Sequence, residues 1–246
     1  MSLSENTEQD GHPATVEDGD ELFHVAVRQI ASKALADGRT GRGARRFVLR
    51  SLAFGDQVIA EYEAKAPVEE KIACRAGCAY CCHYEVILSP AEAVLIGHHA
   101  KHSFSETEAV RLLERTDRIL NLRDGKSVSH RARVLHETPC VFLEDDRCSV
   151  YEVRPLICRA LHSLDRQGCK EAVRAKRSKV AFVGYSHRYY VFQAVRSALR
   201  RTCAEMGCQT RELTIARALV DYFDHPEPSD AWIQGAEVFR GSQEEK

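Results

Sequence analysis

Along most of its length the chain repeats apolar residues every three to four positions, a pattern typical of helices. In residues 21–36 the apolar side chains run from Leu22 to Leu35 and are separated by polar ones. A second helix is predicted over residues 44–65, and Pro67 follows it because proline cannot continue the hydrogen-bond ladder. The same pattern predicts later helices at about residues 165–178, 186–206 and 211–223.

Two further helix starts are marked by capping boxes. Ser89 is followed three residues later by Glu92, and Ser105 is followed in the same way by Glu108. In this motif each side chain satisfies a backbone N–H group that the first helical turn leaves unpaired. We therefore predict helices that begin just after Ser89 and Ser105, the second of them running to about Leu122.

Short stretches have the pattern of strands. Residues 85–88 form a brief apolar run, and residues 141–143 and 148–151 flank the polar sequence Glu-Asp-Asp-Arg. Two apolar runs around a polar turn are typical of a hairpin. The predicted fold is mainly α with a small β-hairpin element.

The polar ends of the chain set the expected domain limits. Residues 1–20 are acidic and poor in apolar side chains, which predicts a disordered tail. Residues 21–228 should form a single metal-stapled helical domain with its metal-binding core at about 74–169. Residues 229–246 are expected to be a polar C-terminal tail.

The amino-acid composition limits the classes of partner that the chain is expected to bind. The 35 Lys and Arg residues nearly balance the 36 Asp and Glu residues, so no charge footprint indicates a nucleic-acid or anionic-membrane partner. No apolar run approaches the roughly 18 residues that a membrane span needs. The first twenty residues also lack the basic and apolar segments of a secretion signal. We expect a cytoplasmic protein.

The ten cysteines are informative in that compartment. Cytosolic thiols are kept reduced, so a disulfide framework is a poor explanation for them. Clustered cytosolic cysteines more often indicate metal or redox chemistry.

The densest cluster holds Cys74, Cys78, Cys81 and Cys82. In a helix these spacings would place four sulfurs on one face, and in a loop they would still let three or four thiolates reach one ion. Both zinc and iron–sulfur clusters accept such ligands. The alternative is a stripe of buried cysteines, because a free cysteine behaves as a small hydrophobe.

A second group follows along the chain. Cys140 and Cys148 would lie on the two arms of the predicted hairpin and could converge on one ion, as in a zinc knuckle. Cys158 and Cys169 come soon afterwards, and their proximity in sequence favours a ligand role for them as well. The nearby Arg154 and Arg159 could offset thiolate charge or bind an anion; the first role is favoured.

Other candidates are weaker. His83, His136 and His162 lie near cysteines, but a hydrogen-bonded or exposed histidine is the more common case. Cys203 and Cys208 lie at a predicted helix end, where packing or a free thiol is favoured over metal binding.

The motifs CxxxCxxCC, PCxFLxxxxCxVYxxRPxxCR and HSLDxxxC together resemble a bacterial cysteine-cluster family (YkgJ-like) described as a zinc- or iron-chelating domain. The resemblance covers roughly residues 74–169 and implies no particular reaction. It implies eight metal-coordinating cysteines, namely Cys74, Cys78, Cys81, Cys82, Cys140, Cys148, Cys158 and Cys169.

Three functions follow from these patterns. The first is a zinc- or iron-binding protein of unassigned reaction, with closed coordination and zinc slightly favoured. The second is a metal- or cluster-dependent enzyme: Cys74, Cys78 and Cys81 have the spacing of radical S-adenosylmethionine enzymes, although no parallel-barrel pattern follows. Some flagellin lysine methylases carry a similar cluster, which leaves a protein substrate open. The third is a thiol redox sensor.

Overall fold

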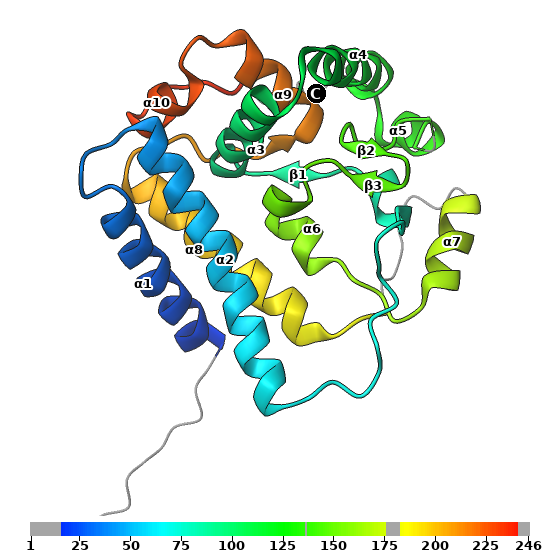
Figure 1. The fold of residues 1–246 in the computed structure, drawn as a ribbon, viewed down its shortest axis with the longest axis horizontal. Coiled ribbons are helices and arrows are strands. Elements are labelled where there is room, and N and C mark those ends of the chain that lie inside the picture. The colour runs from blue at the N-terminus through cyan, green and yellow to red at the C-terminus, as the bar shows by residue number, and fades with distance from the viewer. Residues whose placement is uncertain (1–15, 136, 176–182, 241–246) are drawn as a thin grey trace, which may run out of the picture.

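The computed structural model describes residues 16–135, 137–175 and 183–240 (Figure 1). Three long helices lie side by side: α1 (Val16–Ala34), α2 (Gly41–Lys65) and α8 (Ser186–Glu205). Each has a helical repeat of apolar residues, and burying these faces against one another is the main source of helix stability in a protein. No helix in the described part of the chain is long and apolar enough to cross a membrane.

A second group of helices covers one end of this trio. It consists of α3 (Pro90–Ser103), α4 (Glu106–Arg123), α9 (Ile215–Asp224) and α10 (Pro228–Ile233). Both predicted capping boxes are confirmed at the starts of α3 and α4. α3 lies close against α9, because a Cβ atom at Gly97 would come within 2.4 Å of the Tyr222 ring.

Two small antiparallel strand pairs complete the main elements. β1 (Ile87–Leu88) pairs with β4 (Leu213–Thr214), two residues that the sequence pattern assigned to a helix. β2 (Leu143–Glu144) pairs with β3 (Arg147–Cys148), which confirms the predicted hairpin. Its two turn residues, Asp145 and Asp146, have φ angles of 47° and 59°. Positive φ at both positions matches the twist of a tight hairpin, and Asp tolerates it.

The remaining elements are short and lie around the cysteines. Of the two alternatives for residues 74–82, the loop is the one observed: Gly77 has a φ of 80°, and a 3₁₀ turn forms only after Ala79. These short elements are η1 (Tyr80–His83), α5 (Val128–Arg133), η2 (Tyr151–Val153), α6 (Leu156–Ala160) and α7 (Arg166–Arg174).

The predicted tails require correction where they are described. Helix α1 begins at Val16, inside the tail expected at residues 1–20. At the other end, Trp232 and Phe239 are buried in the core, so residues 229–240 pack on the fold. The indole of Trp232 also donates a hydrogen bond to the Gln209 carbonyl. The rest of both predicted tails lies outside the described residues.

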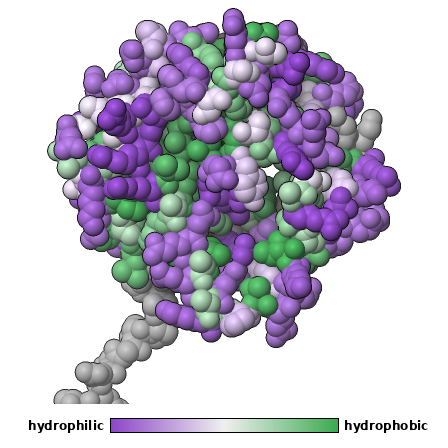
Figure 2. Space-filling model, in the orientation of Figure 1, coloured by the Kyte–Doolittle hydropathy of each residue, from purple (hydrophilic) through white to green (hydrophobic). Residues whose placement is uncertain are grey.

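The fold class is confirmed as mainly α with small β elements. The view in Figure 2 shows a mostly hydrophilic face on which apolar residues appear in small groups. The apolar core lies beneath it, and its largest fully buried side chains include Trp232, Phe47, Phe142, Leu52 and Leu199.

Candidate metal centre

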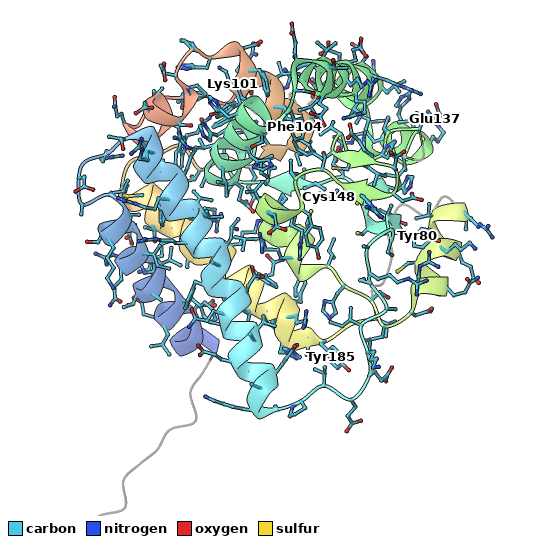
Figure 3. All side chains as sticks on the ribbon, viewed as in Figure 1. Tyr80, Lys101, Phe104, Glu137, Cys148 and Tyr185 are labelled. Carbon is cyan, nitrogen blue, oxygen red and sulfur yellow. The ribbon has the colours of Figure 1, made fainter. Side chains whose placement is uncertain are left out.

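The eight predicted ligands come from separate short elements on one side of the fold. Cys74 and Cys78 lie in the segment that leads into η1, and Cys81 and Cys82 lie in η1 itself. Cys140 precedes the hairpin, and Cys148 lies in β3. Cys158 lies in α6 and Cys169 in α7. Figure 3 labels Cys148 and Tyr80 on neighbouring parts of this side. All ten cysteines of the chain are free thiols.

Two contacts hold these elements together. The N–H of Cys140 donates to the carbonyl of Cys82 over 2.7 Å, which joins the hairpin to η1. The guanidinium of Arg166 in α7 lies 5.3 Å from the centre of the Tyr80 ring in η1, a cation–π contact.

One group of thiols contains Cys74, Cys78 and Cys169. Partial burial raises the pKa of Cys74, and interaction with Cys78, Cys81 and Cys169 raises it further. Burial likewise raises the pKa of Cys169, with further contributions from Cys78 and Cys81. Residues 74–78 and α7 therefore bring their thiols close enough to interact.

A second group contains Cys140, Cys148 and Cys158. Burial raises the pKa of Cys140 to about 12, and Cys148 and Cys81 contribute to the shift. Burial raises the pKa of Cys158 well above its usual range. Interactions with Cys140, Cys148 and Cys81 raise it further.

Cys81, which Cys82 follows directly, belongs to neither group alone. A hydrogen bond with Cys82 is the largest cause of the strongly raised pKa of Cys81, followed by burial. Cys81 also interacts with thiols of both groups. These interactions therefore sort six thiols into two groups of three, with Cys81 common to both.

The fit to a metal can be tested on this donor set. Thiols at this density raise one another's pKa values, and a bound divalent cation reverses that effect by stabilising the thiolates. Soft sulfur donors suit zinc and iron. In the described part of the chain, however, no three or more His, Cys, Asp or Glu side chains are arranged so that they could hold an ion. The donor chemistry therefore fits zinc or iron, while the side chains of the described residues are not set as a ligand cage.

Backbone contacts position Cys74. The N–H of Ser163 donates to its sulfur over 3.3 Å, and the N–H of Ala73 donates to the Ser163 carbonyl over 2.8 Å. Buried Ser163 also lowers the pKa of Cys169 by a side-chain hydrogen bond. Ser163 therefore contacts two candidate ligands from different elements.

His162, next to Ser163, is held in place by both ring nitrogens. Its Nε2 accepts the N–H of Tyr185 over 2.7 Å, so Nδ1 carries the proton and donates to the Ala160 carbonyl over 2.9 Å. Burial lowers the pKa of His162, which favours this neutral form. Neither nitrogen has a lone pair left for a metal. His83 lies in η1, and His136 lies outside the described residues.

The two arginines have different roles. Arg154 lowers the pKa values of Cys81 and Cys148, although burial outweighs it, which fits the predicted offset of thiolate charge. Arg159 instead donates to the Glu152 and Arg154 carbonyls and pairs with Asp56 of α2. It therefore joins the cysteine elements to the long helices.

Cys203 and Cys208 belong to a helix C-cap. The N–H of Cys208 donates to the Cys203 carbonyl, the N–H of Gly207 donates to the Ala204 carbonyl, and Gly207 has a φ of 71°. These features define a Schellman motif, in which the two cysteines occupy the positions whose side chains usually pack together. Both are buried. These positions in the cap explain why packing was favoured over metal binding for Cys203 and Cys208.

A comparison with known families matches the segment that carries these cysteines. Residues 73–182 match the family model described as "CxxCxxCC: Putative zinc- or iron-chelating domain". The match includes all eight predicted ligands, and the resemblance seen in the sequence is confirmed over this segment. Between its first two cysteines the chain has three residues, where the family's name has two. No curated protein and no solved structure matches the chain.

No sequence pattern indicated the contacts that support this segment. The hydroxyl of Tyr185 donates to the Glu70 carbonyl over 2.7 Å, four residues before Cys74. Next to Tyr185, Arg188 and His187 both bind the Glu63 carboxylate at the end of α2. No motif marks Tyr185 or Glu63, because their partners are distant in sequence.

Proposed function

We propose that this chain is a zinc- or iron-binding protein in which the eight cysteines build two closed four-sulfur sites. Cys74, Cys78 and Cys169 supply three ligands of one site, and Cys140, Cys148 and Cys158 supply three of the other. The adjacent Cys81 and Cys82 complete them, one in each. The observation that supports the proposal is that Cys81, which is hydrogen-bonded to Cys82, interacts with thiols of both groups of three.

Closed coordination gives the metal a structural role. Four thiolates satisfy zinc tetrahedrally and leave no position for a substrate. Such a site joins the short elements that carry the cysteines. We favour zinc over iron and assign no reaction to the chain.

The alternatives have less support. An open iron held only by Cys74, Cys78 and Cys81 is the cluster-enzyme hypothesis, but Cys169 also interacts with this group and offers a fourth thiolate. A redox sensor needs exposed thiols of low pKa. Most of the cluster thiols have raised pKa values instead. A cytoplasmic location agrees with reduced thiols, and a protein substrate belongs to the enzyme hypothesis alone.

Metal analysis of protein purified without oxygen tests this proposal. We expect colourless protein with about two zinc ions per chain, from eight thiolates at four per ion. Cys169→Ser and Cys158→Ser should each lower the content by about one ion. Cys208→Ser is the matched control and should leave it unchanged.

Two results would overturn the proposal. Folded protein without stoichiometric metal would remove the metal altogether. Brown protein with sulfur-to-iron absorption that is lost in Cys74→Ser but kept in Cys82→Ser would instead favour an open cluster and an enzyme.

A further inference from the structure

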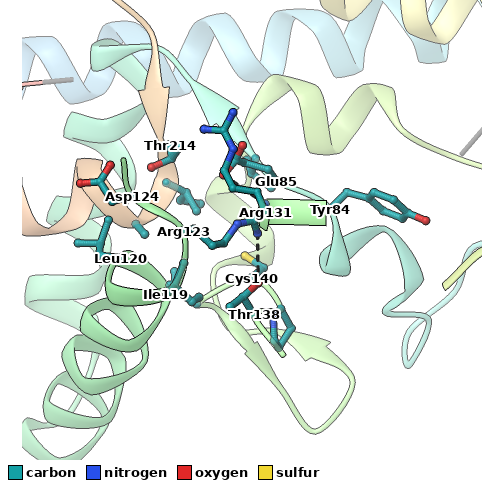
Figure 4. A pocket seen from close by; sticks show the side chains of 15 residues that line it. Tyr84, Glu85, Ile119, Leu120, Arg123, Asp124, Arg131, Thr138, Cys140 and Thr214 are labelled. Atoms are coloured by element: carbon teal, nitrogen blue, oxygen red, sulfur yellow. Dashed lines mark hydrogen bonds and ion pairs between the residues drawn. The ribbon is translucent and has the colours of Figure 1, made fainter. Parts of the chain in front are cut away.

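A partly enclosed cavity of about 30 Å³ lies beside the cysteine elements (Figure 4). Its walls come from the segment before β1, the C-terminal end of α4, α5, the loop before the hairpin, and the start of α9. Cys140 lines one side of it. A cavity of this size holds about two water molecules or one small polar group.

Arg123 on the cavity wall is buried with poor hydrogen bonding. Its side chain is 9% exposed, and its Nε has no hydrogen-bond partner among the residues that the structure describes. Its other nitrogens make only long contacts, 3.4 Å to the Thr138 hydroxyl and 3.3 Å to a Glu85 oxygen. Figure 4 shows this side chain crossing the middle of the pocket. A buried polar group with incomplete partners needs an explanation, because desolvating it is costly.

A second arginine adds positive charge. Arg131 of α5 lines the same cavity, and within the described ranges its guanidinium makes no ion pair. Burial lowers the pKa of Arg123, and the charge of Arg131 lowers it further, so the two cations lie close together. The two lining carboxylates are already paired, Glu85 with Arg123 and Asp124 with Arg217. Of the two arginine charges at the cavity, that of Arg131 is therefore left without a paired carboxylate among the described residues.

The start of α9 also faces this space. In its first turn the N–H of Ile215 donates to the Val86 carbonyl, and the N–H of Arg217 donates to the Thr214 hydroxyl. The N–H of Ala216 between them has no partner within the described ranges. Helix N-termini favour anions because their free N–H groups and the helix dipole both present positive charge.

We propose that this cavity binds a small monocarboxylate anion of the size of formate or acetate. The donors come from three elements: the Arg123 Nε from α4, the Arg131 guanidinium from α5, and the Ala216 N–H from α9. A single surplus charge matches a monoanion better than a dianion, and the volume admits one carboxylate group. The site does not depend on the metal, so it stands apart from the function proposed above.

Calorimetric titration with acetate tests the site, at constant ionic strength and with chloride as the replaced ion. We expect saturable one-to-one binding and a melting temperature that rises with acetate concentration. Arg131→Gln should weaken binding roughly tenfold or more, because it removes a charge-assisted hydrogen bond. Arg133→Gln is the matched control: Arg133 is exposed on the same short helix, does not line the cavity, and should bind acetate normally.

Arg131 has no structural ion pair, so its variant should fold and keep its metal; circular dichroism and metal analysis check this. Three outcomes would overturn the proposal. They are no saturable binding by the parent protein, equal affinity in the Arg131 variant, or equal stabilisation by chloride and acetate. Tighter binding of phosphate than of acetate would also reject the monocarboxylate.

Discussion

The long helices and the cysteine-bearing elements are held together in different ways. The helical body, meaning α1 to α4 and α8 to α10, packs large apolar side chains such as Phe47, Leu199 and Trp232. The cysteine region, meaning residues 73–88 and 137–175, consists of elements of two to nine residues, and η1 has no buried residue. Apolar burial holds the body together and extends into the cysteine region at Phe142 and Leu156, which are fully buried. Around η1, by contrast, the side chains that meet are thiols.

This difference separates two sources of folding free energy. Apolar area removed from water stabilises the body by roughly 25 cal/mol per Å². A structural metal can stabilise its site by about 10 kcal/mol or more, and the apo form is then often unfolded. The two regions should therefore respond differently to metal removal and to core mutation.

Removing the metal should have the largest effect. A strong chelator under reducing conditions should unfold the cysteine region, at a cost of about 10 kcal/mol per site, while the body keeps its helices. Hydrogen exchange would show this as lost protection at residues 73–88 and 137–175 and retained protection in α2 and α8. Loss of protection throughout the chain would mean that the regions are not separate.

Single cysteine substitutions should sharpen the comparison. Cys81→Ser removes the thiol that interacts with both groups and should abolish metal binding in at least one site, with most of that site's stability. Cys203→Ser, in the helix cap of the body, should cost only about 1–3 kcal/mol, because it buries a hydroxyl in place of a thiol. Metal content and denaturant unfolding measure both. Equal losses of metal in the two variants would contradict the separate roles.

A core substitution in the body should lower the free energy of unfolding without lowering the metal content. Phe47 is fully buried in α2, and Phe47→Ala should cost about 3–5 kcal/mol by leaving a cavity. Metal content per folded chain should stay unchanged, because Phe47 lies far from the cysteines in sequence and belongs to the body. Loss of metal at temperatures where the variant remains folded would show that the body shapes the site.

Local signals predicted most of the body. The capping boxes at Ser89 and Ser105 and the run at residues 186–206 place helices within a few residues of those observed, because caps and apolar periodicity act over one or two turns. Long-range pairing was not predictable in this way. Leu213 and Thr214 look helical in sequence but pair with β1, and residues 229–240 look polar although Trp232 anchors them in the core.

The candidate site was predictable in composition and not in arrangement. The cysteine motifs identified the family that residues 73–182 match. The grouping of thiols depends on tertiary contacts: Cys169 reaches Cys74 because α7 packs on η1 and because Ser163 contacts both. The supporting role of Tyr185 had no sequence signal, since its partner Glu70 is 115 residues away.

The smallest effect concerns the junction of the two regions. Glu63 at the end of α2 accepts hydrogen bonds from Nε and Nη2 of Arg188, each at 2.6 Å, and is hydrogen-bonded to His187 at 2.8 Å. His187 and Arg188 lie in the first turn of α8, just after Tyr185. The hydroxyl of Tyr185 binds the segment that leads to Cys74. Glu63→Gln should therefore loosen the junction without removing a metal ligand.

Hydrogen bonds from Arg188, aided by His187, lower the pKa of Glu63 to about 2, against a usual value of 4.5. A lowered carboxyl pKa means that the charged form is favoured on folding, so the contribution is complete above about pH 4.5 and is lost as the pH falls toward 2. At pH 7 Glu63→Gln should cost about 1 kcal/mol in urea unfolding, a typical value for a partly exposed charged pair. The difference from the parent protein should shrink as the pH is lowered from 5 toward 3.

The matched control is Glu61→Gln on the same helix, where the carboxylate is exposed and, among the described residues, binds only Gln57. That control should be nearly neutral at every pH, and an equal, pH-independent loss in both variants would show that the junction adds nothing specific.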